Sequence, residues 1–94
     1  MVINLKHGNY TDCSIKLSVY HNGRTSLSVM TSGIPLLKAS VNLPDHELPT
    51  GCIFIKNWSE NEGILSELIR HNIIEDTDIF VSSGYVDVNV CKLL

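Results

Sequence analysis

The sequence predicts an α+β fold in which one antiparallel β-meander sheet of five to seven strands packs against a single α-helix, within one domain covering residues 1–94. The first observation is composition, because 18 of the 94 residues are Val or Ile and only one is Ala, which favours strands. The second is the alternation of apolar and polar residues in short segments separated by turn residues. The third is a single segment with helical periodicity, within residues 59–72.

Apolar and polar residues alternate along residues 13–19, 25–29 and 37–43, which predicts three strands with one buried face each. Asn22-Gly23 suits a two-residue hairpin turn because both residues tolerate positive φ, and Thr31-Ser32-Gly33 provides a second turn. These strands form an antiparallel meander whose buried face includes Leu17 and Val19. The opposite face is rich in Ser, Asn and Lys and is expected to be solvated. Residues 2–5 predict a further strand, paired through a turn at residues 7–9.

Pro44, Pro49 and Gly51 predict a loop over residues 44–51, followed by a short, fully apolar strand at residues 52–55 that is expected to be central in the sheet. Ser59 and Glu62 form a capping-box pattern, S-x-x-E, that predicts the helix start. One face of the predicted helix is apolar and consists of Ile64, Leu65, Leu68 and Ile69. The helix is expected to end at a left-handed Asn72, with Ile73 closing the hydrophobic contact. Residues 75–78 then predict an acidic loop, and residues 79–81 and 86–90 predict two more strands.

The formal net charge of -3 argues against a general nucleic-acid binder or an anionic-membrane binder, because both need a cationic surface. The charge is unevenly distributed: residues 1–43 have a net charge of +3, and residues 44–94 have a net charge of -6.

No apolar run approaches the roughly 18 residues that a membrane helix needs, and the first residues lack the pattern of a signal peptide. We therefore expect a cytoplasmic protein. Its three widely spaced cysteines, Cys13, Cys52 and Cys91, do not predict a disulfide framework.

No motif in the sequence predicts catalysis, a metal or a cofactor. The four histidines lack the spacing of zinc ligands, and the D-x-D at residues 76–78 lacks the further ligands and the turn glycine of a calcium loop. Ser82-Ser83-Gly84 lacks the first glycine of a nucleophile elbow. We therefore expect a protein that is not an enzyme and that binds no metal or cofactor.

The strongest candidate for a binding surface is the acidic segment from Ser59 to Asp78, whose only cation is Arg70 and whose net charge is -5. Such a surface attracts a basic partner and raises the association rate, and a neighbouring aromatic side chain can anchor the contact. The predicted acidic face consists of Trp58, Glu60, Glu62, Glu67, Glu75, Asp76, Asp78 and Tyr85. The competing interpretation is structural: Glu60 and Glu62 favour a helix N-terminus, and Trp58 packs on the core.

Several short blocks occur in an order that resembles a family of short proteins carried by phages and plasmids and described as a domain of unknown function. The blocks are Val41-Asn42-Leu43-Pro44, Leu48-Pro49, Gly51-Cys52, the run from Trp58 to Gly63, and Ser83-Gly84-Tyr85-Val86. Members often have Thr-Gly-Arg after the helix, where this chain has Thr77-Asp78-Ile79. The resemblance implies a mobile-element accessory protein, and it suggests an anti-CRISPR-type or other anti-defence inhibitor that binds a basic host effector protein through the predicted acidic face.

Two other functions remain as alternatives. The chain could be a small-molecule module that binds a nucleotide signal through the basic half, with Lys38, Arg24, Tyr10 and Tyr20 as the candidate residues. It could also be a self-assembling structural accessory protein, because exposed strand edges and a small core favour a homodimer.

Overall fold

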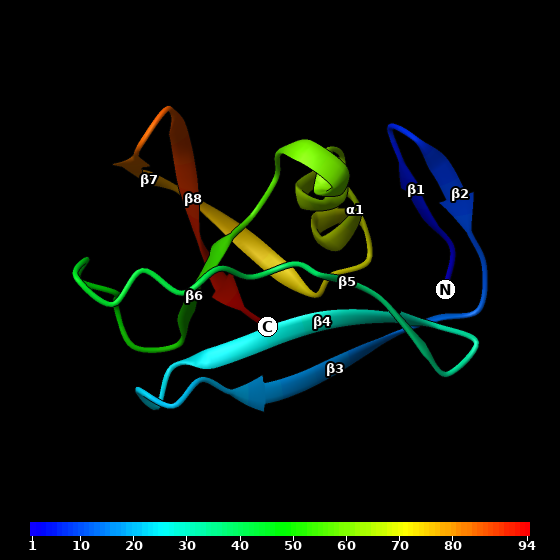
Figure 1. Cartoon of the computed structure of the whole chain (residues 1–94), viewed down its shortest axis with the longest axis horizontal. Coiled ribbons are helices and arrows are strands. Elements are labelled where there is room, and N and C mark those ends of the chain that lie inside the picture. Colours follow the sequence, from blue (N-terminus) through cyan, green and yellow to red (C-terminus); the bar gives the residue numbers. More distant parts are fainter.

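A computed structural model describes residues 1–94 and divides the strands among three antiparallel sheets beside one short helix (Figure 1). The first sheet is a hairpin of β1 (Ile3–Leu5) and β2 (Gly8–Tyr10). The second is a meander in the order β3-β4-β5, and the third has the order β6-β8-β7. The bounds are β3 (Cys13–Val19), β4 (Thr25–Thr31), β5 (Ile34–Lys38), β6 (Cys52–Ile55), β7 (Ile74–Ser83), β8 (Val86–Leu93), the 3-10 helix η1 (Ser59–Asn61) and α1 (Ile64–Arg70). Helix α1 lies between β1 and the third sheet, so the α+β class is confirmed, whereas the single sheet is wrong.

The sheet divides because the chain leaves the meander directly after β5. The amide of Ala39 still donates to Leu27 O at 2.9 Å, but the amide of Val41 donates to Phe54 O at 3.1 Å. The predicted strand over residues 37–43 therefore ends at Lys38, and residues 39–41 connect the second sheet to the third. Ser40, which the alternation placed on the solvated face, is buried, and its Oγ accepts the Leu27 amide proton at 2.9 Å.

The two turns of the meander differ from each other. The amide of Gly23 donates to Tyr20 O at 2.8 Å and Gly23 has φ +86°, so the first loop contains three residues between Tyr20 and Arg24 rather than two. Ser32 and Gly33 both have positive φ, at +49° and +78°, and form a two-residue turn where the sequence predicts the second turn.

The start of the helix differs from the capping-box prediction. Ser59 has φ +59° and opens the 3-10 turn, and no side chain caps it. Instead, Asn57 Oδ1 accepts the amide protons of Gly63 at 3.2 Å and Leu65 at 2.9 Å, so Asn57 satisfies two donors at the start of α1. The predicted helix end is confirmed, because Asn72 has φ +59° and the amide of Ile73 donates to Leu68 O at 2.9 Å.

The Asn57→Ala variant is expected to lose about 1–2 kcal/mol of the free energy of unfolding, because two amide protons at the helix start lose their acceptor. Urea denaturation followed by circular dichroism measures this loss. The matched control is Ser59→Ala, which is expected to cost less than about 0.5 kcal/mol because Ser59 makes no capping bond. A larger loss for Ser59→Ala than for Asn57→Ala would show that Ser59 caps the helix, as the S-x-x-E pattern predicts.

The third sheet confirms the predicted strands at residues 79–81 and 86–90 but not their neighbours. Strand β8 is central and β6 lies at the edge, contrary to the prediction for residues 52–55. The predicted acidic loop at residues 75–78 belongs to β7, which continues through a bulge between Asp76 and Ile79. Thr77 holds this bulge, because its Oγ1 donates to Val90 O at 2.6 Å and accepts the Ile79 amide proton at 3.2 Å.

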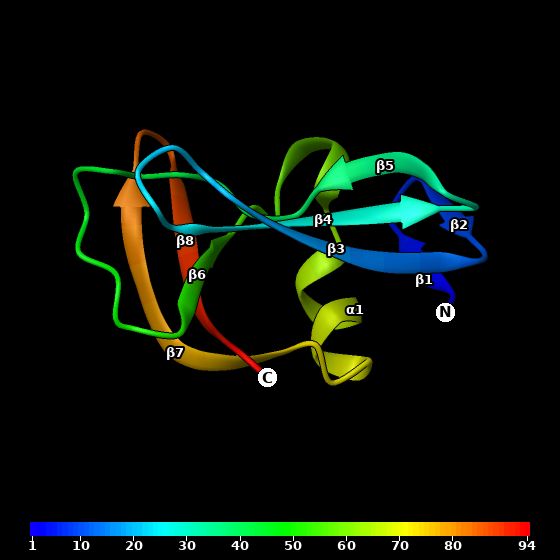
Figure 2. The ribbon, with the colours of Figure 1, turned by 90° about the horizontal axis from the view of Figure 1, so that it is seen from below.

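The buried side chains form two clusters. The larger lies among α1 and all three sheets, and the smaller consists of Phe54, Val88 and Val90. Strand β3 is an edge strand of the second sheet, with β4 on one side only (Figure 2). Leu17 and Val19 are 55% and 69% exposed, although the alternation predicted that they would be buried. The unpaired edge of β3 is a surface on which the expected homodimer could form, and the homodimer stays a prediction.

The three cysteines are free thiols, with Cys13 and Cys91 buried and Cys52 partly exposed. Burial raises the pKa of Cys91 to about 12, and the nearby Asp76 and Cys52 raise it further. The structure contains no helix with the length and apolar character needed to cross a membrane.

Candidate functional site

The eight residues of the predicted acidic face lie on two different elements. Trp58, Glu60, Glu62 and Glu67 form a helix group at η1 and α1. Glu75, Asp76, Asp78 and Tyr85 form a hairpin group on β7 and the turn that joins it to β8. The two groups differ in whether their carboxylates are paired, and this difference decides which of them can meet a partner.

Each carboxylate of the helix group already has a cationic partner. Glu60 accepts from Lys56 Nζ at 2.6 Å, a hydrogen bond that lowers the pKa of Glu60 to about 2, and Glu62 forms an ion pair with Lys6 at 3.0 Å. Glu67 is buried: its Oε1 accepts the Asn4 amide proton, and its Oε2 accepts from Arg70 Nε at 2.7 Å. A partner that bound this group would have to replace existing ion pairs.

Trp58 also has a structural role. It is partly buried and packs against the cluster of Phe54, Val88 and Val90, as the structural interpretation of the sequence held. The helix group therefore connects η1 and α1 to neighbouring elements and presents little uncompensated charge.

The carboxylates of the hairpin group form no ion pair with any cation. Asp76 Oδ1 accepts the Asp78 amide proton at 3.0 Å, which fixes the bulge and leaves Asp78 exposed. Glu75 lies opposite Lys92 in the register and is therefore the one member with a cation across the strand. Tyr85, in the turn, is fully exposed.

Two residues outside the predicted acidic face complete this surface. Phe80 is 60% exposed and pairs with Asn89, and Asp87 pairs with Ser82, whose Oγ donates to Asp87 Oδ1 at 3.2 Å. Cross-strand partners share a face, and alternate residues of β8 point the same way, so Asp76, Phe80 and Asp87 lie on one face of the hairpin. The consecutive apolar residues Ile79-Phe80-Val81 carried a signal for this exposure, because a strand cannot bury three neighbours on one face.

We call Asp76, Asp78, Phe80, Tyr85 and Asp87 the hairpin patch. It combines an exposed aromatic ring and a tyrosine with three carboxylates, and no cation within the patch neutralises them. In Figure 1 the β7–β8 hairpin extends away from α1, with its turn at the upper left.

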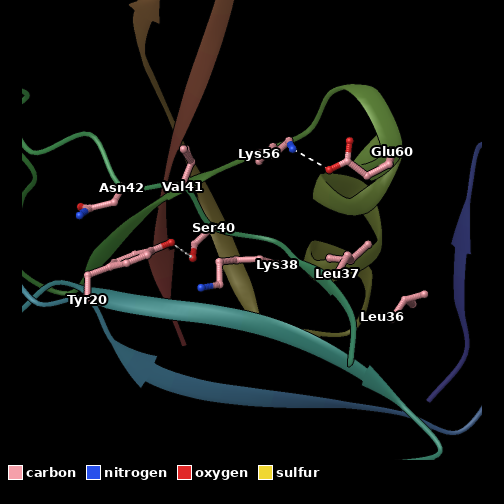
Figure 3. Close-up of a pocket in the computed structure, with 9 residues that line it drawn as sticks. All are labelled: Tyr20, Leu36, Leu37, Lys38, Ser40, Val41, Asn42, Lys56 and Glu60. Atoms are coloured by element: carbon pink, nitrogen blue, oxygen red, sulfur yellow. Dashed lines mark hydrogen bonds and ion pairs between the residues drawn. The ribbon is translucent and has the colours of Figure 1, made fainter. Parts of the chain in front are cut away.

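The residues proposed for nucleotide binding are only partly brought together. Lys38 Nζ lies 5.3 Å from the centre of the Tyr20 ring, and both residues line a hollow of about 380 Å³ (Figure 3). Arg24 is committed elsewhere, because its guanidinium donates to Leu43 O and His46 O, both at 2.7 Å. Tyr10 lies on β2 in the first sheet.

No three His, Cys, Asp or Glu side chains are grouped so that they could hold a metal ion. Comparison of the chain with protein-family models, with curated proteins and with solved structures finds no match.

Proposed function

We propose that this chain is a non-enzymatic binding protein that engages a basic protein partner through the hairpin patch. Its role would be that of an anti-CRISPR-type or other anti-defence inhibitor that is carried by a mobile element and acts on a host defence effector. The observation that carries the proposal is the exposed Phe80 beside unpaired carboxylates on an edge strand. The class of partner, a basic host defence effector, comes from the resemblance of the sequence blocks to phage and plasmid accessory proteins.

The chemistry of the patch suits recognition of a protein. Asp76, Asp78 and Asp87 can pair with lysine or arginine without breaking an ion pair within the chain. Phe80 and Tyr85 offer large side chains whose burial at an interface is favourable, and aromatic residues are frequent among those that dominate binding energy. The carboxylates accelerate association and give it a dependence on salt.

The proposal moves the contact away from the helix. Of the predicted acidic face it keeps Asp76, Asp78 and Tyr85, and it adds Phe80 and Asp87. Glu75 is left out because it lies opposite Lys92 in the register. Glu67 has no place in it, since this carboxylate is buried and holds the N-terminal strand.

Neutralising the patch is expected to weaken binding of the partner. The variant D76N/D78N/D87N keeps oxygen acceptors at the bulge and at Ser82 and removes three negative charges, so its fold should be unchanged. We expect at least about a tenfold loss of affinity in low salt, mainly through slower association. Phe80→Ala is expected to cost about tenfold or more through faster dissociation.

The measurement uses a partner captured from host cells with the wild-type chain, followed by interferometry on the purified pair. The matched control is E60Q/E62Q, which removes two negative charges that are already paired with Lys56 and Lys6 and should change affinity less than about threefold. Loss of binding in this control, with D76N/D78N/D87N unaffected, would restore the helix as the contact surface. Binding that neither variant weakens would reject an acidic contact altogether.

A further inference from the structure

A row of three polar residues crosses the second sheet on the face turned away from the core. The register pairs Lys16 with Ser28 and Ser28 with Lys38, so their side chains share one face. The flanking residues of β4, Leu27 and Val29, are fully buried on the opposite face. Adjacent strands lie about 4.8 Å apart, so the two lysines stand about 10 Å apart at the backbone with the Ser28 hydroxyl between them.

Neither lysine of this row has an acidic partner. Lys6, Lys56 and Arg70 form the ion pairs of the chain, whereas Lys16 and Lys38 form none and donate no side-chain hydrogen bond. A hollow of about 370 Å³ lies over the row; it is lined by Lys16, Ser18, Ser28, Met30, Pro35, Leu36, Leu37 and Lys38, with no carboxylate among them. The lining thus supplies two lysines and two serines and no acid, a composition that favours the binding of an anion.

A second hollow adjoins the first along β5. Leu36, Leu37 and Lys38 line both hollows, and Figure 3 shows Lys38 beside the Tyr20 ring, with the Tyr20 hydroxyl hydrogen-bonded to Ser40 Oγ at 2.8 Å. Lys38 thus lies between the candidate anion-binding hollow and the aromatic ring of Tyr20. Its ammonium group rests over the ring at 5.3 Å, an interaction weaker than the charge-assisted bond that a phosphate could make.

We propose that this face binds a nucleotide, with the phosphate held by Lys16, Ser28 and Lys38 and the base placed against Tyr20. When Lys38 turns from the ring to the phosphate, the ring is left free to contact a planar base. The apolar side chains of Leu36 and Leu37 provide the wall between the two parts of the ligand. The site shares no residue with the hairpin patch, so either one can be absent without the other.

The test is isothermal titration of the full chain with three probes: AMP, adenosine and inorganic phosphate. AMP is expected to bind at least about tenfold more tightly than adenosine or phosphate alone, since it alone reaches both parts of the site. K16Q and K38Q are each expected to lower the affinity for AMP about fivefold or more. Tyr20→Leu should lower the affinity for AMP and leave the affinity for phosphate unchanged. The matched control is the variant K92Q, which replaces an exposed lysine on β8 and should leave the affinity for AMP unchanged.

Thermal unfolding without ligand shows whether each variant keeps the fold, which we expect for K16Q and K38Q because both side chains are exposed. Equal affinity for AMP and adenosine would overturn the role of the lysine row, and equal affinity for AMP and phosphate would overturn the role of Tyr20. Absence of saturable AMP binding up to about 10 mM would overturn the proposal as a whole.

Discussion

Replacing Phe54 with alanine is expected to lower the free energy of unfolding by about 3–5 kcal/mol. Phe54 is 1% exposed and forms the centre of the smaller cluster with Val88 and Val90. Its ring also meets the edge of the His46 ring, with centroids 6.4 Å apart, so it joins β6, β8 and the loop at residues 44–51. A domain of this size has about 5–15 kcal/mol in total, so the variant loses a large share of its stability.

The sequence contains a matched control for this experiment, because its only other phenylalanine is Phe80. Phe80 is 60% exposed, and Phe80→Ala should change stability by about 0.5 kcal/mol or less. Urea denaturation of both variants, followed by tryptophan fluorescence from Trp58, measures the two losses. Comparable losses for the two variants would contradict the assignment of Phe54 to the core and of Phe80 to the surface.

The contrast between these two residues shows which features the sequence could predict. Local patterns identified the β3–β4 hairpin, the C-terminal end of α1 at Asn72 and the strands around Ser82-Ser83-Gly84, because periodicity and turn residues act over a few positions. They also predicted the short, fully apolar strand at residues 52–55, which contains the buried Phe54. They did not predict where a strand changes its partner, since the bonds of Ala39 and Val41 to Leu27 and Phe54 join segments far apart in the sequence.

The candidate site was predicted less well than the fold. Counting carboxylates along residues 59–78 located an acidic region, but the count could not show which charges are neutralised, because Lys6 and Lys56 reach Glu62 and Glu60 only in the folded chain. The order β6-β8-β7 makes β7 an edge strand, and its position exposes Phe80. Sequence patterns find the residue types of a surface, and the topology decides which of them remain available.

Glu67→Ala is expected to destabilise the chain by about 2–3 kcal/mol, the second-largest effect, although Glu67 was predicted as a partner-binding residue. The side chain is buried, and its Oε1 accepts the amide proton of Asn4, which attaches β1 to α1. Alanine leaves that amide without an acceptor and leaves Arg70 without its carboxylate. The exposed Arg70 adds little to the loss, since solvent screens its charge. Chemical denaturation at pH 7 measures the effect. The control is Glu47→Gln, at an exposed position in the loop, which should cost less than about 0.5 kcal/mol.

The pH dependence separates the charge of Glu67 from its role as an acceptor. The hydrogen bond from Arg70 lowers the pKa of Glu67, and the bond from the Asn4 amide lowers it further against the opposing effect of burial. A carboxyl whose pKa is lower in the folded chain stabilises the fold fully above its unfolded pKa, near 4.5, and the stabilisation is lost as the pH falls through the folded pKa. Glu67→Gln keeps an oxygen for Asn4 and removes the ionisation, so wild type should be more stable than this variant at pH 7 and the difference should shrink below about pH 4.5. A difference that is the same at pH 7 and pH 3 would show that Glu67 acts through packing alone, with no contribution from its charge.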